Sequence, residues 1–172
     1  MKTLVTYISS SGNTKALAQA LYDGIEGSKD ILPMDEVKDV GRYDVIFVGF
    51  PIIAKGAPRK ARRFLSGPAK GKKVGLFITH GMPGSMKMLG PMLEKCKAAA
   101  RDAEVIGTMD CQGKLAGWMA SLFRLYPNAE VREWVRAGGE SIGVGHPGKE
   151  DLEKAREFAS RLTGPRDQAI VS

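Results

Sequence analysis

The stretch that decides the fold is Leu4-Val5-Thr6-Tyr7-Ile8-Ser9-Ser10-Ser11-Gly12-Asn13-Thr14, close to the start of the chain. An apolar run followed by small hydroxyl-bearing residues and glycine is typical of a buried strand that ends in a tight loop. Leu17, Leu21 and Ile25 then follow at intervals of four, which predicts a helix with one buried stripe. The chain therefore begins as a strand, a hydroxyl-rich loop and a helix.

The loop at residues 9–14 has the features of a phosphate-binding site. The first turn of a helix has backbone N–H groups without partners and carries the positive end of the helix dipole, so it attracts anions. Hydroxyl donors and a flexible glycine come from Ser9, Ser10, Ser11, Gly12, Asn13 and Thr14. The loop has no lysine or arginine until Lys15 and no G-K-[ST] is present, so it suits a small monophosphate rather than a triphosphate with magnesium. The alternative is a serine-rich turn that only caps the helix.

Apolar runs and helical periodicity continue along the chain in alternation. The predicted strands cover residues 4–8, 30–34, 45–50, 74–79 and 104–109, and the predicted later helices begin at Pro58 or cover 85–100 and 149–162. Strands that alternate with helices favour a parallel sheet. The continuous apolar character of residues 45–50 is typical of a strand that is buried on both faces.

The loop Ser9–Thr14 fits the pattern [ST]-x-[ST]-G-x-T and resembles the FMN-phosphate loop of the flavodoxins. The resemblance continues through Tyr43–Gly49 with Pro51 and through Val74–Gly81, and it covers residues 2 to about 163. It implies a three-layer α/β sandwich with a five-stranded parallel sheet in the order 2-1-3-4-5. The chain is then a single flavodoxin-like domain over residues 1–163, and residues 164–172 form a C-terminal tail.

The resemblance also implies where FMN binds. In this fold ligands lie beyond the carboxyl ends of the strands, where the loops at 9–14, 51–56 and 79–84 meet. Flavodoxins usually stack a tryptophan and a tyrosine on the flavin ring, but the matching loops here are aliphatic. They supply Pro51, Ile52, Ile53, Ala54 and Lys55 on one side and Thr79, His80, Gly81 and Met82 on the other. Such a site holds the ring by burial of area and leaves one face open to another molecule.

His80 is the histidine closest to the predicted ring. It could donate a hydrogen bond to the ring carbonyls or bias the charge near the reduced ring. The alternative is a loop histidine that caps backbone groups.

Residues from about 111 to 146 form an insert that a minimal five-stranded domain does not need. Large apolar residues fall at helical spacing there, at Leu115, Trp118, Met119, Leu122, Phe123 and Tyr126. The stripe must be buried against the domain itself, a partner or a membrane. We expect residues 113–127 to form a cap near the flavin that orders on partner binding, because Gly113 and Gly117 weaken the helix start. Ordinary packing on the domain is the alternative, and a second short helix is predicted at 129–136.

The charge is concentrated in one segment. The chain carries a net charge of +7, and residues 55–73 contain eight lysines and arginines and no acid. Flavodoxins are usually acidic, so this basic segment predicts recruitment of an acidic redox partner or an anionic substrate. A solvated helix face is the alternative. No nucleic-acid motif is present, so no nucleic-acid partner is expected, and contact with a membrane surface is less favoured than contact with a protein.

Composition excludes several classes of protein and site. No apolar run approaches the roughly 20 residues of a membrane helix, and because Met1-Lys2 leads directly into the first predicted strand, no signal peptide is expected. The two cysteines form no CxxC and fit a cytoplasmic location, with Cys96 in the core. Histidine and cysteine do not cluster, so no metal site is expected. The G-x-G-x-x-G at residues 143–148 precedes only one helix and is interpreted as a turn, with His146 a turn residue rather than a ligand.

Three functions remain open from the sequence. The first is an FMN-binding electron carrier, in which no side chain acts as a catalytic acid or base. The second is an FMN-dependent oxidoreductase of the protoporphyrinogen oxidase or quinone reductase type, since flavodoxin-like protoporphyrinogen oxidases also carry a long, basic and apolar insert. The third is a binding module that has lost the flavin.

Overall fold

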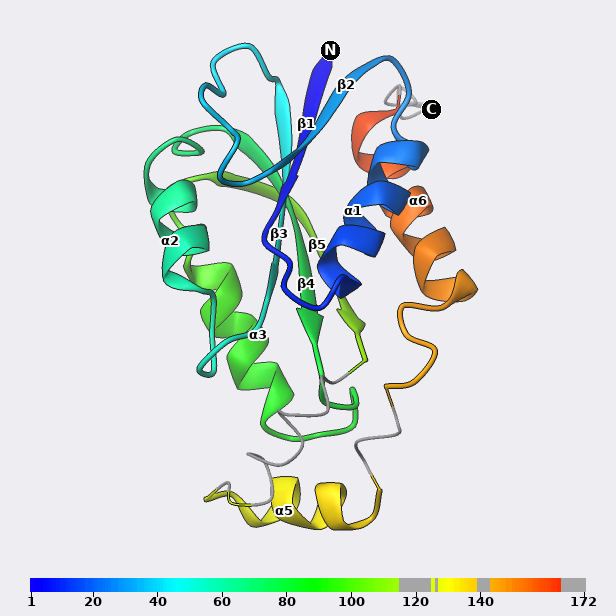
Figure 1. The fold of residues 1–172 in the computed structure, drawn as a ribbon. Coiled ribbons are helices and arrows are strands. Elements are labelled where there is room, and N and C mark those ends of the chain that lie inside the picture. Colours follow the sequence, from blue (N-terminus) through cyan, green and yellow to red (C-terminus); the bar gives the residue numbers. More distant parts are fainter. Residues whose placement is uncertain (115–124, 126, 139–142, 165–172) are drawn as a thin grey trace, which may run out of the picture.

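A five-stranded parallel sheet forms the middle layer of the protein (Figure 1). The computed structural model describes residues 1–114, 125, 127–138 and 143–164. Within them the strands are β1 (Lys2–Tyr7), β2 (Ser28–Pro33), β3 (Val45–Pro51), β4 (Lys73–His80) and β5 (Glu104–Gln112). Their order is β2-β1-β3-β4-β5, and neighbouring strands are parallel throughout. The predicted sheet is therefore confirmed.

Helices cover both faces of the sheet (Figure 1). One face carries α1 (Asn13–Gly24) and α6 (Lys149–Thr163), and the other carries α2 (Arg59–Ser66) and α3 (Leu89–Ala98). A further helix, α5 (Ala129–Arg136), lies beyond the carboxyl ends of the strands, at the bottom of Figure 1. The Asn128 side chain caps α5 by accepting a hydrogen bond from the Val131 amide at 3.3 Å. The three-layer sandwich and the short helix at 129–136 are thus confirmed.

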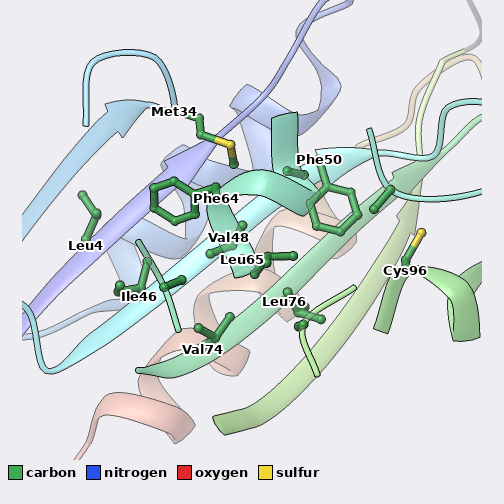
Figure 2. Packing of buried hydrophobic residues seen from close by; sticks show 14 of the residues in the cluster. Leu4, Met34, Ile46, Val48, Phe50, Phe64, Leu65, Val74, Leu76 and Cys96 are labelled. Atoms are coloured by element: carbon green, nitrogen blue, oxygen red, sulfur yellow. The ribbon is translucent and has the colours of Figure 1, made fainter. Parts of the chain in front are cut away.

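The core between the sheet and the α2–α3 layer is built from the alternate, inward residues of the central strands. Figure 2 shows Leu4, Ile46, Val48, Phe50, Val74 and Leu76 of the strands packed against Phe64 and Leu65 of α2 and Cys96 of α3. Cys96 is a core residue, as predicted, and burial raises the pKa of its thiol to about 11. A thiol with so high a pKa stays protonated at neutral pH and is unreactive.

On the opposite face, two phenylalanines fit over two glycines of the neighbouring strand. Phe47 of β3 is paired in register with Gly75 of β4, and Gly49 is paired with Phe77. A Cβ atom at Gly49 would lie 2.0 Å from the Phe77 ring, and one at Gly75 would lie 2.7 Å from the Phe47 ring. A shift of two residues between β3 and β4 would pair Phe47 with Phe77 and place ring on ring, so these pairs hold the register that aligns the two strand ends.

Two predicted boundaries differ from the structure by three residues or more. The helix expected at 85–100 begins only at Leu89, because Pro91 lacks an N–H donor and is tolerated only in the first helical turn. The strand expected to end at 109 continues to Gln112. This is because β4 extends to His80, and His80 pairs in register with Gln112.

The ladder continues with a hydrogen bond from the Gly113 amide to the His80 carbonyl at 2.8 Å, so β5 and its extension occupy the first part of the predicted insert. The apolar stripe at 115–126 and the cap proposed at 113–127 fall almost entirely outside the described residues.

Residues 143–148 form the turn into α6, as predicted for the G-x-G-x-x-G segment. Gly148 is the residue before the first turn of the helix, and its amide donates to the Asp151 carboxylate at 2.8 Å. His146 lies in this turn, with its Nδ1 atom 2.6 Å from Asp151 Oδ2. The histidine therefore has a local structural partner.

Candidate functional site

The hydroxyl-rich loop ends at an open helix N-terminus. Gly12 precedes α1 with φ 90° and ψ −19°, a left-handed conformation that favours glycine, and no described side chain caps the helix. The Gly12 amide donates to Ser9 Oγ at 3.1 Å, which closes the turn, while Ser10 and Ser11 are exposed. The N–H groups of the first turn of α1 have no acceptor within the helix, so they can bind an anion.

Two of the predicted loops meet behind this helix end. The hydroxyls of Thr14 and Thr79 are hydrogen-bonded at 2.8 Å, and both residues are buried. The Ile52 amide also donates to the Thr79 carbonyl at 2.8 Å, which ties the end of β4 to the loop after β3. The structure therefore brings the segments at 9–14, 51–56 and 79–82 to the same edge of the sheet, as predicted.

The loop after β3 is a tight and strained turn. Ile53 and Gly56 bond each other's backbones at 2.9 and 3.1 Å, and the residues between them, Ala54 and Lys55, have φ values of 49° and 67°. Left-handed conformations are unfavourable for residues with a Cβ, and such strain is concentrated at functional sites. The side chain of Ile53 is 52% exposed at this turn, so it offers an apolar contact surface at the ligand edge.

Ala54→Gly should raise the free energy of unfolding of the ligand-free protein by about 0.5–1 kcal/mol, because glycine adopts a positive φ without steric cost. Urea denaturation measures the change. Ala16→Gly, an exposed position within α1, is the matched control and should lower the free energy of unfolding by about 0.5–1 kcal/mol. A loss of stability in Ala54→Gly would show that the turn is not strained.

His80 is buried at the end of β4 and has two protein partners. Its Nδ1 atom lies 2.7 Å from the Met82 carbonyl oxygen, and its Nε2 atom lies 3.1 Å from Asp110 Oδ2. The hydrogen bond from His80 holds the pKa of the Asp110 carboxyl below its usual value, despite partial burial of that group. Because both ring nitrogens are engaged, the structure supports the backbone-capping alternative rather than donation to a ring carbonyl. His80 therefore positions the segment at 80–82.

Met82 lies in a methionine-rich cluster rather than on an open surface. It packs with Met86, Leu89, Met92 and Val131, and Ile52, Met88, Leu93 and Trp134 lie against them. Ile52 and Met82, one from each predicted ring loop, thus meet beneath α5. This arrangement was not predicted, because residues 52, 82 and 134 are far apart in the sequence. Trp134 places an aromatic residue at an edge whose two loops have none, whereas Trp118 and Phe123 lie outside the described residues.

Two side-chain donors at this edge are buried without a partner among the described residues. They are Nε2 of Gln112, at the end of β5 beside His80, and Nε1 of Trp134. A buried donor left unpaired costs about 1–3 kcal/mol, so an acceptor supplied by a ligand would be favourable. The open helix end, the exposed Ile53 and these donors fit a ligand that joins a phosphate to a planar ring rich in carbonyl groups. Within the described residues, no cluster of three or more His, Cys, Asp and Glu side chains could hold a metal ion.

Solved structures share the overall architecture. A flavodoxin from the domain Archaea is 19% identical with a TM-score of 0.58, over 95% of this chain and 96% of that one. A flavodoxin from Megasphaera elsdenii, in its two-electron reduced form, is 24% identical with a TM-score of 0.52, over 80% of this chain and 98% of that one. A flavoprotein from Lactobacillus acidophilus NCFM in complex with FMN is 18% identical with a TM-score of 0.51, over 63% of this chain and 92% of that one. At these identities the similarity establishes the fold.

Sequence comparison establishes the family. The flavodoxin-like domain-containing protein BilS from Clostridioides difficile (strain CD3) is 31% identical over 172 residues, which is 94% of this chain and 96% of that protein. A flavodoxin-domain family model matches residues 4–160, from β1 to near the end of α6. The chain therefore belongs to the flavodoxin-domain family.

Proposed function

We propose that the protein binds FMN at the carboxyl edge of its sheet and carries electrons to a redox partner. The observation that carries the proposal is the open N-terminus of α1, with Gly12 in a left-handed conformation and the Thr14–Thr79 pair behind it. FMN supplies the redox chemistry, because its ring accepts one or two electrons. The protein contributes binding, orientation and control of access to the ring.

The residues at the edge divide into two groups. Ser9–Thr14 would hold the phosphate through hydroxyl and backbone donors. Pro51–Lys55 and Thr79–Met82 would hold the ring, with the exposed Ile53 as its apolar contact and Gln112 as a donor to a ring acceptor. His80 acts on the ring only through the backbone of Met82.

The hydrogen bonds of His80 favour an electron carrier over an enzyme. Its ring nitrogens are occupied by Met82 and Asp110, so it is not free to move a proton to a substrate. The second candidate is an FMN-dependent oxidoreductase of the protoporphyrinogen oxidase or quinone reductase type. It is favoured by the position of α5 over the ligand edge, where an insert could shape a substrate pocket. Steady-state turnover with NAD(P)H and a quinone, or with a porphyrinogen, separates the two, since a carrier alone turns over neither.

A cytoplasmic location is part of the proposal. It rests on the cysteines, since Cys96 and Cys111 are both buried free thiols. Burial also raises the pKa of Cys111 to about 12, so this thiol stays protonated at neutral pH. No helix in the part of the chain that the structure describes has the length and apolar character to cross a bilayer.

The exposed arginines of α2 are the proposed docking face for an acidic partner or an anionic substrate. The basic segment 55–73 is not one uniform surface, because Lys60 forms an ion pair with Asp35 and Lys72 donates to the carbonyls of Gly41 and Tyr43. Arg59, Arg62 and Arg63 are exposed on α2, which follows the loop after β3 and so begins at the ligand edge.

Reversing Arg59, Arg62 and Arg63 to glutamate should slow oxidation of the FMN-loaded, reduced protein by ferricyanide about tenfold or more, because a positive surface attracts this anion. Stopped-flow absorbance measures the rate. The effect should shrink at high salt, since exposed charges are screened over about 10 Å at 0.1 M.

Two controls test whether the charge acts locally. Reversing Lys38, Arg101 and Arg161, which are exposed elsewhere, changes the net charge equally and should have a smaller effect. Oxidation by hexaamminecobalt(III), a cation, should become faster in the arginine variant. Equal rates for the two triple variants would refute a docking role for α2.

A further inference from the structure

The two ends of the insert are joined to each other at the ligand edge. The Lys114 amide donates to the His146 carbonyl at 3.0 Å. Gly143 fits so closely that a Cβ atom there would lie 2.7 Å from the Gly113 oxygen and 3.1 Å from Lys114 Cα. The segment that leaves β5 and the turn that enters α6 therefore form one packed unit.

This unit lies directly against the start of α1. The Asn13 side chain donates from Nδ2 to the Lys114 carbonyl at 3.0 Å. A Cβ atom at Gly113 would lie 2.4 Å from the same Nδ2, so only glycine fits there. Asn13 is the first residue of α1 and belongs to the proposed phosphate loop. Residues 113–114 thus form a wall beside that loop, although Lys114 lies 101 positions after Asn13 in the chain.

The wall is anchored from behind by α6. Asp151, in the first turn of α6, accepts from the Gly148 amide at 2.8 Å and lies 2.6 Å from His146 Nδ1. His146 in turn holds Lys114 through its carbonyl. Contacts therefore run continuously from α6 to the start of α1, and they fix the backbone of Lys114 beside Asn13.

We propose that Lys114 supplies the cation of the phosphate site, with Gly113–Lys114 as its outer wall. Lys114 is exposed, and none of the ion pairs among the described residues includes it. The loop at 9–14 contains no cation, whereas a phosphate monoester carries a charge of about −1.5 to −2 at pH 7. The ligand class is therefore a phosphate monoester, and the inference rests on the proposed binding of FMN at this loop.

The test measures the FMN affinity of Lys114→Gln at several salt concentrations. Quenching of FMN fluorescence on binding gives the dissociation constant. The dissociation constant should rise about 5- to 30-fold at low salt. It should also depend less on salt, because one ion pair is removed. Riboflavin affinity should not change, and Lys114→Arg should retain FMN affinity. Lys73→Gln, at the opposite edge of the sheet, is the matched control and should behave as the unmodified protein.

A Lys114→Gln protein with unchanged FMN affinity and an unchanged salt dependence would overturn the inference. Equal losses for FMN and riboflavin would also overturn it, since they would indicate a purely structural role. Gly143→Ala tests the wall itself, and with Lys114 intact it should weaken FMN binding more than riboflavin binding. If the unmodified protein does not prefer FMN over riboflavin, the proposed phosphate site fails instead, so the two failures are distinguishable.

Discussion

Ser10→Ala and Thr14→Ala will each weaken FMN binding by about 1.5–3 kcal/mol, or about 10- to 150-fold, because each removes a hydrogen bond to a charged group. Ser10 is exposed in the loop before α1, and Thr14 lies in the first helical turn with its hydroxyl beside Thr79. Isothermal titration with FMN and with riboflavin measures the loss, which should appear only for FMN.

Matched variants distinguish the loss of a hydroxyl at the phosphate site from a general effect on the fold. Thr14→Ser keeps the hydroxyl and should retain most of the affinity, whereas Thr14→Ala also leaves the Thr79 hydroxyl without its partner. Ser66→Ala, exposed at the end of α2, is the control for Ser10→Ala and should not alter binding. Unchanged FMN affinity in both loop variants would show that the phosphate does not bind at residues 9–14.

Phe47→Ala will lower the free energy of unfolding by about 3–5 kcal/mol, which is a large part of the roughly 5–15 kcal/mol that stabilises a typical domain. The ring is fully buried, packs over Gly75 and meets Phe158 of α6 edge to face at 6.0 Å between centroids. Removing it leaves a cavity between the sheet and α6. Urea denaturation followed by circular dichroism gives the change.

Val105→Ala is the control for this prediction, because Val105 is 41% exposed on the edge strand β5. It should change stability by no more than about 0.5 kcal/mol. A loss below about 1 kcal/mol in Phe47→Ala would mean that the packing of β3 against α6 contributes little.

The parts of the fold that local sequence determines were predicted well. The apolar run before Ser9, the left-handed Gly12 and the periodic leucines of α1 are neighbours in sequence, and they form the strand, turn and helix start that their spacing predicts. Long apolar runs likewise predicted the buried strands β3 and β4. The start of α3 also follows from a local rule, because Pro91 is tolerated only in the first turn of a helix.

The contacts that shape the site could not be predicted in the same way. One partner of His80 is Asp110 on another strand, and Asn13 contacts Lys114, which lies 101 positions further along the chain. No local pattern marks Gln112 as a buried donor that lacks a partner in the part of the chain that the structure describes. The basic segment 55–73 was predicted from charge alone, and only the structure separates the exposed arginines of α2 from Lys60 and Lys72, which have partners. Such long-range pairings depend on strand register and loop packing.

The central claim, that FMN binds with its phosphate at residues 9–14, is tested most directly by comparing two ligands on the unmodified protein. Riboflavin shares the ring and the ribityl chain of FMN but lacks the phosphate. The account predicts that FMN binds at least about tenfold more tightly, because several charged hydrogen bonds are made only to the phosphate. Titration of the ligand-free protein with each compound, followed by quenching of flavin fluorescence, gives both dissociation constants. Riboflavin binding as tight as FMN binding would contradict the account.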